Sequence, residues 1–333
     1  MTTETSEATS ASGEDRGRPA RTAGPTPPAP IVPALSSAER LALAEQYGLQ
    51  PMGVRPPLTR YLRDLFARWA FIRTLGSATA YSKNQNNYLG QLWAVLNPTL
   101  NALVYVLVFG VLIGANRGVT NSVAFIVIGV FLFRFIDQSV QGGARSIAQK
   151  TNLIRSLHFP RAVLPIAQVF SLLATLVPTL FVMCAIVLLS GFIPAYTQIH
   201  VTWYWLLLPC IVALIWVFNT GLAFIMARVV AITPDLDNII SFVMRFAMYG
   251  SGVIFPVTHY VDRLPDGVEA VLDPILTYQP IAVFLYVARS ILMQEESIPP
   301  DAWMWLWATL WAVVTLVFGF IVFWRGEERY GRD

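Results

Sequence analysis

The chain has 333 residues, of which 55% are hydrophobic and only 13% carry a charge, and its formal net charge is +3. About a quarter of the residues of an ordinary soluble domain are charged, so this composition excludes a typical soluble protein. The apolar residues form continuous runs long enough to cross a bilayer, and they do not alternate with polar residues as in a membrane β-barrel. The expected fold class is therefore an all-α polytopic membrane protein.

Residues 1–57 are predicted to be a cytoplasmic N-terminal segment that is disordered to about residue 35. The first 35 residues are rich in Ser, Thr, Ala, Pro and Gly, a composition that does not support a packed core. Acidic residues occupy the place where a signal peptide has its apolar region, so no signal peptide is expected. The sequence SSAER at 36–40 indicates the start of a helix.

Residues 58–75 are predicted to form an amphipathic helix that lies in the membrane interface. Arg60, Arg63, Asp64 and Arg68 share one side of a helical wheel, and leucine and aromatic residues share the other. A basic helix with aromatic residues on its apolar face is typical of a membrane surface. The alternative is a soluble helix that packs on its own chain.

The transmembrane domain is predicted at 92–324, and a short cytoplasmic tail follows at 325–333. The domain is expected to contain six transmembrane helices, at about 92–114, 121–141, 162–190, 203–227, 238–258 and 302–324. Residues 274–293 form a less regular run, with Pro274 and Pro280 near its start and Arg289 near its end. Because its unbroken apolar part is short for a span, this run is expected to form periplasmic re-entrant helices before the last span.

The charges in the connecting loops predict the orientation of the chain. The connection between the second and third spans contains Arg145, Lys150, Arg155 and Arg161, and no Asp or Glu occurs between residues 138 and 234. The opposite side contains most of the acidic residues. Since cytoplasmic loops are rich in Lys and Arg, both termini are expected in the cytoplasm of a bacterium, with the chain in its inner or plasma membrane.

Several kinds of chemistry are missing from the sequence. Neither of the two lysines, Lys83 and Lys150, follows a glycine, so there is no Walker A phosphate-binding loop. Cys184 and Cys210 fall inside predicted spans, and no cysteine or histidine spacing suggests a metal site. We therefore expect no catalytic residue, no metal, no cofactor bound by this chain and no nucleic-acid partner. Active transport needs a separate ATPase chain that holds ATP and Mg.

Polar and aromatic residues inside the predicted spans are candidates for a transport conduit. They are Asn97, Asn101 and Tyr105 in the first span, Arg134 in the second, and Phe242, Arg245 and Tyr249 in the fifth. Residues spaced by three or four share one helix face, and a central Arg or Asp in a span costs about 2.5–3.5 kcal/mol on insertion scales. The alternative is that these stripes only pack helices together.

The segment NLIRSLHFPRAVLP at 152–165 is basic, lies between two apolar runs and is stopped by proline. Residues 151–159 are predicted to form a coupling helix that docks in a groove of a partner protein. The residues assigned to this contact are Leu153, Ile154, Arg155, Phe159, Pro160 and Arg161. The alternative is a loop that only satisfies the positive-inside rule.

The same segment resembles the pattern N-x-x-L-I-[RK]…F-P-R-x-x-L-P of ABC-2 type permeases that export polysaccharides. LGQLWAVLNP at 89–98 is similar to the entry to their first span. FPVTHY at 255–260 is a weaker likeness to their S-P-V-x-Y near the end of span five, with Phe255 in place of Ser. The DP and YQP pairs at 273–280 weakly resemble the N-P before their periplasmic re-entrant helices. Where the family usually has an Arg-Asp pair before the fifth span, this chain has TPDLDN at 233–238.

The resemblance implies the membrane subunit of a Wzm-type exporter for O-antigen, teichoic acid or galactan precursors. In that family two copies form one conduit and bind two copies of a separate ATPase. The substrate is a glycan on a polyprenyl diphosphate lipid. The Ala- and Arg-rich N-terminal tail favours a high-GC organism, and with it a galactan.

Two other functions stay open at this point. One is an ABC-2 permease for a small amphiphile or drug. The other is an integral-membrane glycosyltransferase or lipid-processing enzyme, which needs paired carboxylates in a loop near the membrane. The acidic residues at 262–273 and 295–301 are the candidates for such a pair, and they fit solvated periplasmic surfaces better.

Overall fold

The computed structural model describes residues 36–47, 56–83, 88–90, 92–108, 119–157, 159–194, 196–257, 267–327 and 330. The chain divides into two compact units, at residues 1–52 and 53–333. In the first unit, helix α1 spans Ser37–Gln46. Ser36 and Glu39 exchange hydrogen bonds between side chain and backbone, as in a capping box, so the predicted helix start is confirmed. The disorder predicted for residues 1–35 lies outside the described residues.

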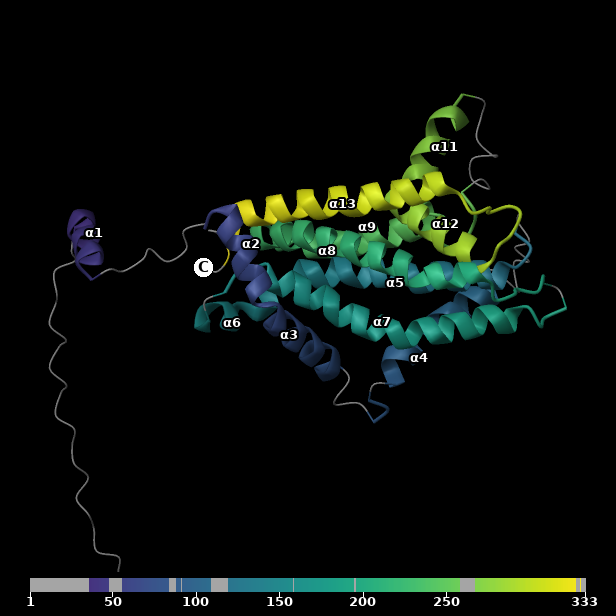
Figure 1. Cartoon of the computed structure of the whole chain (residues 1–333), viewed down its shortest axis with the longest axis horizontal. Coiled ribbons are helices and arrows are strands. Elements are labelled where there is room, and N and C mark those ends of the chain that lie inside the picture. The colour runs from purple at the N-terminus through teal and green to yellow at the C-terminus, as the bar shows by residue number, and fades with distance from the viewer. Residues whose placement is uncertain are drawn as a thin grey trace, which may run out of the picture. The chain divides into compact units, whose positions relative to one another are not determined.

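The second unit is helical in the part of the chain that the structure describes, with no strand there (Figure 1). Its helices are α2 (Leu58–Ala67), α3 (Trp69–Ser82), α4 (Leu92–Tyr105), α5 (Ser122–Arg145), α6 (Thr151–Ser156), α7 (Val163–Ser190), α8 (Leu208–Ile232), α9 (Leu236–Gly250), α11 (Glu269–Tyr278), α12 (Pro280–Leu292) and α13 (Ala302–Arg325). The predicted all-α class is confirmed for these residues.

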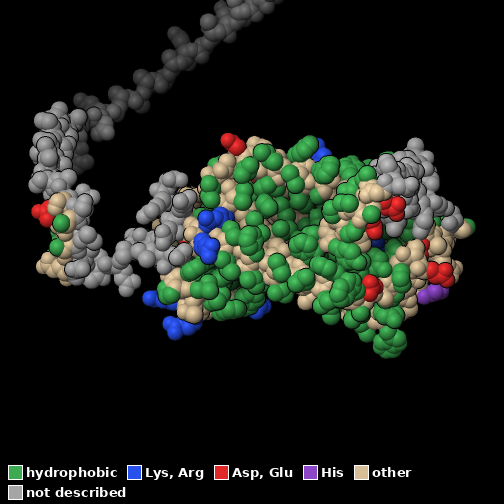
Figure 2. Space-filling model, turned by 90° about the horizontal axis from the view of Figure 1, so that it is seen from above, with side chains coloured by type: hydrophobic (Ala, Val, Ile, Leu, Met, Phe, Trp, Pro, Cys, Tyr) green, Lys and Arg blue, Asp and Glu red, His purple; other side chains and the backbone are tan. Residues whose placement is uncertain are grey.

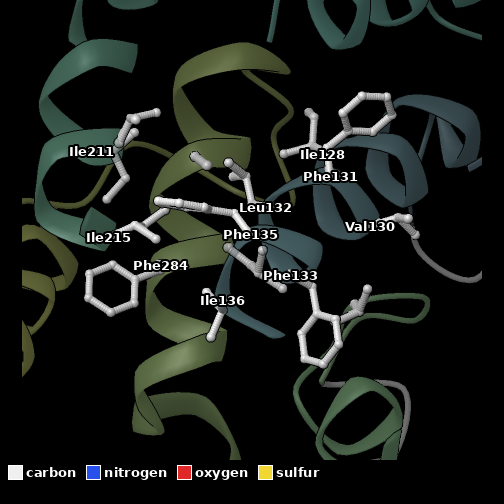
Figure 3. Close-up of a cluster of buried hydrophobic side chains, with 14 of the residues drawn as sticks. Ile128, Val130, Phe131, Leu132, Phe133, Phe135, Ile136, Ile211, Ile215 and Phe284 are labelled. Atoms are coloured by element: carbon white, nitrogen blue, oxygen red, sulfur yellow. The ribbon is translucent and has the colours of Figure 1, made fainter. Parts of the chain in front are cut away.

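Helix α5 forms the centre of this unit. It is buried along most of its length and packs against α7, α8, α9 and α12. Figure 3 shows part of the core, where α5 side chains lie with Ile211 and Ile215 of α8 and Phe284 of α12. The outer helices α7 and α13 are apolar on all sides and bury only one stripe each, as expected where the remaining surface faces lipid.

Helices α8 and α13 form the most extensive helix pair, and they approach closely at two glycines. A Cβ added to Gly221 would overlap the backbone of Thr315, and one added to Gly319 would overlap the carbonyl group of Gly221. Small residues let the backbones of membrane helices come together. This contact fixes the C-terminal span against the rest of the bundle.

Four helical segments are long and apolar enough to cross a membrane: Ser122–Arg145, Val163–Ser190, Trp203–Ile232 and Ala302–Arg325. They correspond to the second, third, fourth and sixth predicted spans. Helices α11 and α12 meet at a bend of 68° and add a fifth candidate if the bent pair is one span. Of the first predicted span, 92–108 is helical and shorter than a crossing helix, and the rest lies outside the described residues.

The prediction for the fifth span was wrong at its C-terminal end. Helix α9 stops at Gly250 instead of continuing to about residue 258. Gly252 has a φ of 71°, a left-handed conformation that glycine adopts readily and that ends a helix. Val253 and Ile254, which follow it, lie in a turn and are buried in the core.

Charged side chains gather at the two ends of the second unit, and hydrophobic side chains cover much of the surface between them (Figure 2). Lys and Arg lie mainly at the end that holds α2 and α6, while Asp, Glu and His lie mainly at the end near α11 and α12. A surface divided in this way fits a chain that crosses a bilayer.

Candidate functional site

The predicted coupling helix is present but short. Helix α6 begins at Thr151 and ends at Ser156. Leu157 already has extended backbone, with φ −131° and ψ 140°, so the helix predicted over 151–159 was too long at its C-terminal end. Arg155 and Leu157 are exposed, and Leu157 retains 49% of its accessible surface. The Leu157 side chain is therefore available to a partner protein at the basic end of the unit.

Phe159 and Ile154 have partners within the chain. Both pack against a cluster of buried residues from α2, α3, α7, α8 and α13. The Phe159 ring meets the edge of the Phe71 ring at a centroid distance of 5.5 Å. Phe159, which the sequence assigned to the partner contact, is therefore half-buried, because α3 covers one side of it. Leu153 is half-buried.

A buried polar network follows directly after α6, and we call it the Tyr61–Glu327 junction. The Tyr61 hydroxyl donates to Glu327 Oε2 at 2.9 Å and accepts from the backbone N–H of Ala162 at 3.1 Å. The backbone N–H of Arg161 donates to Glu327 Oε1 at 3.0 Å, and the Arg161 guanidinium donates to the Glu327 carbonyl. The junction thus joins α2, the start of α7 and the segment after α13.

The electrostatics of the junction keep Tyr61 protonated. Tyr61 is 1% exposed and Glu327 is 9% exposed. Burial raises the pKa of the Glu327 carboxyl, and the hydrogen bonds from Arg161 and Tyr61 oppose this effect. Burial, and after it the negative charge of Glu327, hold the pKa of Tyr61 well above its usual range. Tyr61 is therefore a permanent hydrogen-bond donor to Glu327 at neutral pH.

The predicted interface helix at 58–75 is divided into α2 and α3. The break is at Arg68, which has φ −97° and ψ 19°. Tyr61 and Leu65 are buried against the bundle, whereas Phe66 is 71% exposed and Trp69 is 41% exposed. One apolar edge of this region therefore packs on its own chain, and another stays open.

The conduit candidates come from three helices, and the structure brings most of them close together. The Tyr105 hydroxyl donates to Met248 Sδ at 3.5 Å, which joins α4 to α9. Arg134, Arg245 and Tyr249 lie within electrostatic reach of the same hydroxyl.

The remaining candidates line the surface beside this group. Asn97 and Asn101 are exposed on α4, and the Asn101 amide donates to the Asn97 carbonyl at 2.7 Å. Phe242 is 70% exposed on α9. The first turn of α9 is anchored from α5, because Arg145 Nε lies 2.8 Å from the Asp237 carboxylate.

Arg289 of α12 was not selected from the sequence, yet it occupies a central position. It is 5% exposed and donates to the carbonyl groups of Gly252 at 2.8 Å, Val253 at 2.7 Å and Phe125 at 3.1 Å. Its guanidinium lies 3.3 Å from the centre of the Phe125 ring. The signal in the sequence was an arginine within an apolar run that has no carboxylate one helical turn away from it. Its hydrogen bonds join α12, α5 and the end of α9.

The described helices and their surface define a multi-pass helical membrane protein with a basic end, a short helix exposed at that end and a polar surface on α4 and α9. No family model matches the chain. The chain is similar to the O-antigen export system permease protein RfbA of Myxococcus xanthus, with 28% identity over 220 residues that cover 66% of this chain and 81% of the relative. It is also similar to an RfbA permease of Klebsiella pneumoniae, with 24% identity over 210 residues that cover 63% of this chain and 74% of the relative. The resemblance to polysaccharide-export permeases is confirmed by these relatives.

Proposed function

We propose that this chain is the membrane-spanning permease subunit of an ABC exporter for a lipid-linked polysaccharide. The exporter carries a glycan on polyprenyl diphosphate from the cytoplasm to the outer side of the inner or plasma membrane, and galactan is the preferred glycan. The names of the curated relatives support polysaccharide export. The sequence contains no Walker A loop, so a separate ATPase supplies the energy and binds ATP and Mg.

The observation that carries the proposal is the exposure of polar side chains on α4 and α9. Asn97, Asn101, Arg245 and Tyr249 are exposed beside apolar side chains of the same helices. A charged group that faces hydrocarbon is costly, so such residues ordinarily face protein or a water-filled space. Two copies of the chain with these surfaces opposed enclose a conduit, and each copy binds one ATPase through α6.

The first prediction concerns topology. With both termini cytoplasmic and α11–α12 re-entrant, single cysteines at His200 and Ser297 are expected to react with an impermeant thiol reagent from outside, because both positions are exposed. A cysteine at Asn152, next to the exposed face of α6, is expected to react only after the membrane is opened. The measurement is labelling of intact cells in a chain whose Cys184 and Cys210 are replaced by alanine. Labelling of position 152 in intact cells contradicts the topology.

The second prediction concerns transport itself. Depletion of the chain is expected to leave lipid-linked glycan on the cytoplasmic leaflet while its synthesis continues, because export and synthesis are separate steps. The measurement is the amount and the sidedness of lipid-linked glycan in isolated membrane vesicles. Depletion of the ATPase partner is the control, and it should cause the same accumulation of lipid-linked glycan on the cytoplasmic leaflet.

The purified chain is expected to hydrolyse no ATP alone and to co-purify with an ATPase at equal stoichiometry. ATP hydrolysis by the chain without a partner contradicts the proposal. Loss of glycan synthesis on depletion also contradicts it and favours a lipid-processing enzyme.

A further inference from the structure

A cleft between α3, α4, α5 and α7 contains two cationic side chains and no carboxylate. Its volume is about 150 Å³, well above the roughly 10–15 Å³ that one water molecule needs. Lys83 and Arg134 are the charged residues of its lining. Its lining also includes Asn97, Phe131, Phe135, Gln138, Thr175, Leu176 and Thr179.

The cleft places two cations far from the ends of the membrane-crossing helices. Arg134 lies in the middle of α5 (Ser122–Arg145), and Thr175 and Thr179 lie near the middle of α7 (Val163–Ser190). Lys83 reaches this level because it follows the C-terminal end of α3, which packs along α7. The two positive charges therefore stand about halfway along the membrane-crossing helices, where charged groups carry a large solvation cost.

The surroundings compensate this positive charge only in part. The sequence has no Asp or Glu between Asp64 and Asp137, and α7 has none either. Asp137, one turn from Arg134, is the nearest carboxylate of these four helices and accepts a hydrogen bond from Gln141 at 2.7 Å. Two cations and one carboxylate leave a net charge of +1. Lys83 and Arg134 form no ion pair within 4.0 Å among the described residues, where the ion pairs are Arg60–Asp64 and Arg145–Asp237.

The two cations also affect each other. Lys83 and Arg134 line the same cleft and carry charge of the same sign. Like charges repel, and a bound anion relieves both the repulsion and the solvation cost. Arg and Lys are the side chains that proteins use to bind phosphate.

We propose that this cleft binds the diphosphate group of the lipid-linked substrate halfway through the membrane. Lys83 and Arg134 neutralise the diphosphate, and Asn97, Thr175 and Gln138 offer neutral hydrogen-bonding groups beside it. The apolar wall of Phe131, Phe135 and Leu176 accommodates the first part of the lipid chain. This assignment rests on the proposed export of a polyprenyl diphosphate lipid and names the part of the substrate that the chain recognises.

The test is equilibrium binding of undecaprenyl diphosphate to the purified full chain in phosphatidylcholine nanodiscs. Lys83→Gln and Arg134→Gln are each expected to weaken binding at least tenfold, about 1.4 kcal/mol. Lys83→Arg keeps the charge and is expected to bind within about threefold of the wild type, a smaller loss than removal of a charge-assisted contact gives. Lys150→Gln removes the other lysine of the chain, which lies outside the cleft, and is the matched control. Because each glutamine variant removes one of two repelling charges, these chains are expected to fold.

The source of the phosphate is tested by competition with phosphatidylglycerol. A lipid with a single negative charge is expected to displace undecaprenyl diphosphate only at a large excess. Displacement at equal concentrations would show that the cleft binds anionic lipids in general, and it overturns the proposal. Binding of undecaprenyl diphosphate at wild-type affinity by the Lys83→Gln/Arg134→Gln double variant also overturns it. If the double variant both binds undecaprenyl diphosphate and exports glycan normally, the assignment of the cleft is wrong and the proposed export function is unaffected. Failure of the wild-type chain to export ends the proposed function, while the binding data still decide the cleft.

Discussion

Gly221→Ala is expected to remove most of the folded chain from the membrane. The added Cβ overlaps the backbone of Thr315 on α13, and a backbone cannot move aside as a flexible side chain can. Overpacking in a well-packed core costs typically about 1–3 kcal/mol and more where backbones must separate. The pair of α8 and α13 holds the last span, and the segment after α13 supplies Glu327 to the junction. Separation of these helices therefore disturbs both the bundle and the coupling region.

The measurement is thermal stability by size-exclusion chromatography of the detergent-solubilised chain. Gly250→Ala is the matched control, because no atom lies within 4 Å of the added Cβ at the end of α9. Alanine is about 0.5–1 kcal/mol better than glycine in a helix, so this control is expected to be as stable as the wild type or slightly more stable. Equal melting temperatures for Gly221→Ala and Gly250→Ala contradict the close approach of α8 and α13.

The long helices could be predicted from the sequence because apolar length is a local property. The second span was expected at about 121–141 and is Ser122–Arg145, and the last was expected at 302–324 and is Ala302–Arg325. The C-terminal end of the fifth span was predicted wrongly, because a run of apolar residues does not reveal where the backbone turns. Gly252 adopts positive φ, and Ile254 is buried in the turn that follows.

The contacts between distant parts of the chain could not be predicted. Tyr61 and Glu327 are 266 positions apart, and no periodicity or motif relates an aromatic residue of an amphipathic helix to an acid in a basic tail. Tyr61 was correctly placed on the apolar face, but the same pattern fits a membrane surface and a protein core. Arg289 was noted only as a charge near the end of an irregular apolar run, whereas it is buried among backbone carbonyl groups.

The segment 151–160 contains one feature that the sequence predicted and one that it did not. The sequence predicted a short helix before Pro160, and α6 is present at Thr151–Ser156. It did not predict which apolar side chains remain exposed, because that depends on where α3 lies. The edge contact of Phe159 with Phe71 leaves Phe159 half-buried, and Leu157 takes the exposed position.

In the proposed complex, this difference predicts that docking of the ATPase and transmission of its movement depend on different residues. Leu157 is exposed beside α6, so Leu157→Ala is expected to weaken capture of the ATPase. Truncation of a central anchor in an interface often costs at least ~2 kcal/mol, which is more than tenfold in affinity. Tyr61 is buried and lies behind the docking surface, where it joins the exit from α6 to α2 and to the segment after α13.

Tyr61→Phe is expected to leave ATPase capture intact and to reduce export at least tenfold. The lost hydroxyl leaves Glu327 Oε2 and the Ala162 N–H without their buried partner, and each unsatisfied group costs about 1–3 kcal/mol. The start of α7 then moves independently of α2 and of the segment after α13, so closure of the ATPase dimer moves α6 without moving the spans together. The measurements are co-purification of the ATPase, its rate of ATP hydrolysis in the complex, and glycan export at equal membrane levels.

Tyr204→Phe makes the same chemical change at an exposed tyrosine that lies outside the junction. A chain with this substitution is expected to export glycan normally. Glu327→Ala removes the other member of the junction and should reproduce the Tyr61→Phe result, with ATP hydrolysis retained and export lost. If Tyr61→Phe loses the ATPase as Leu157→Ala does, the junction supports docking and not transmission. If Tyr61→Phe exports at the wild-type rate with normal ATP hydrolysis, the movement of α6 reaches α5 and α7 alone, and the amphipathic helix α2 has no part in coupling.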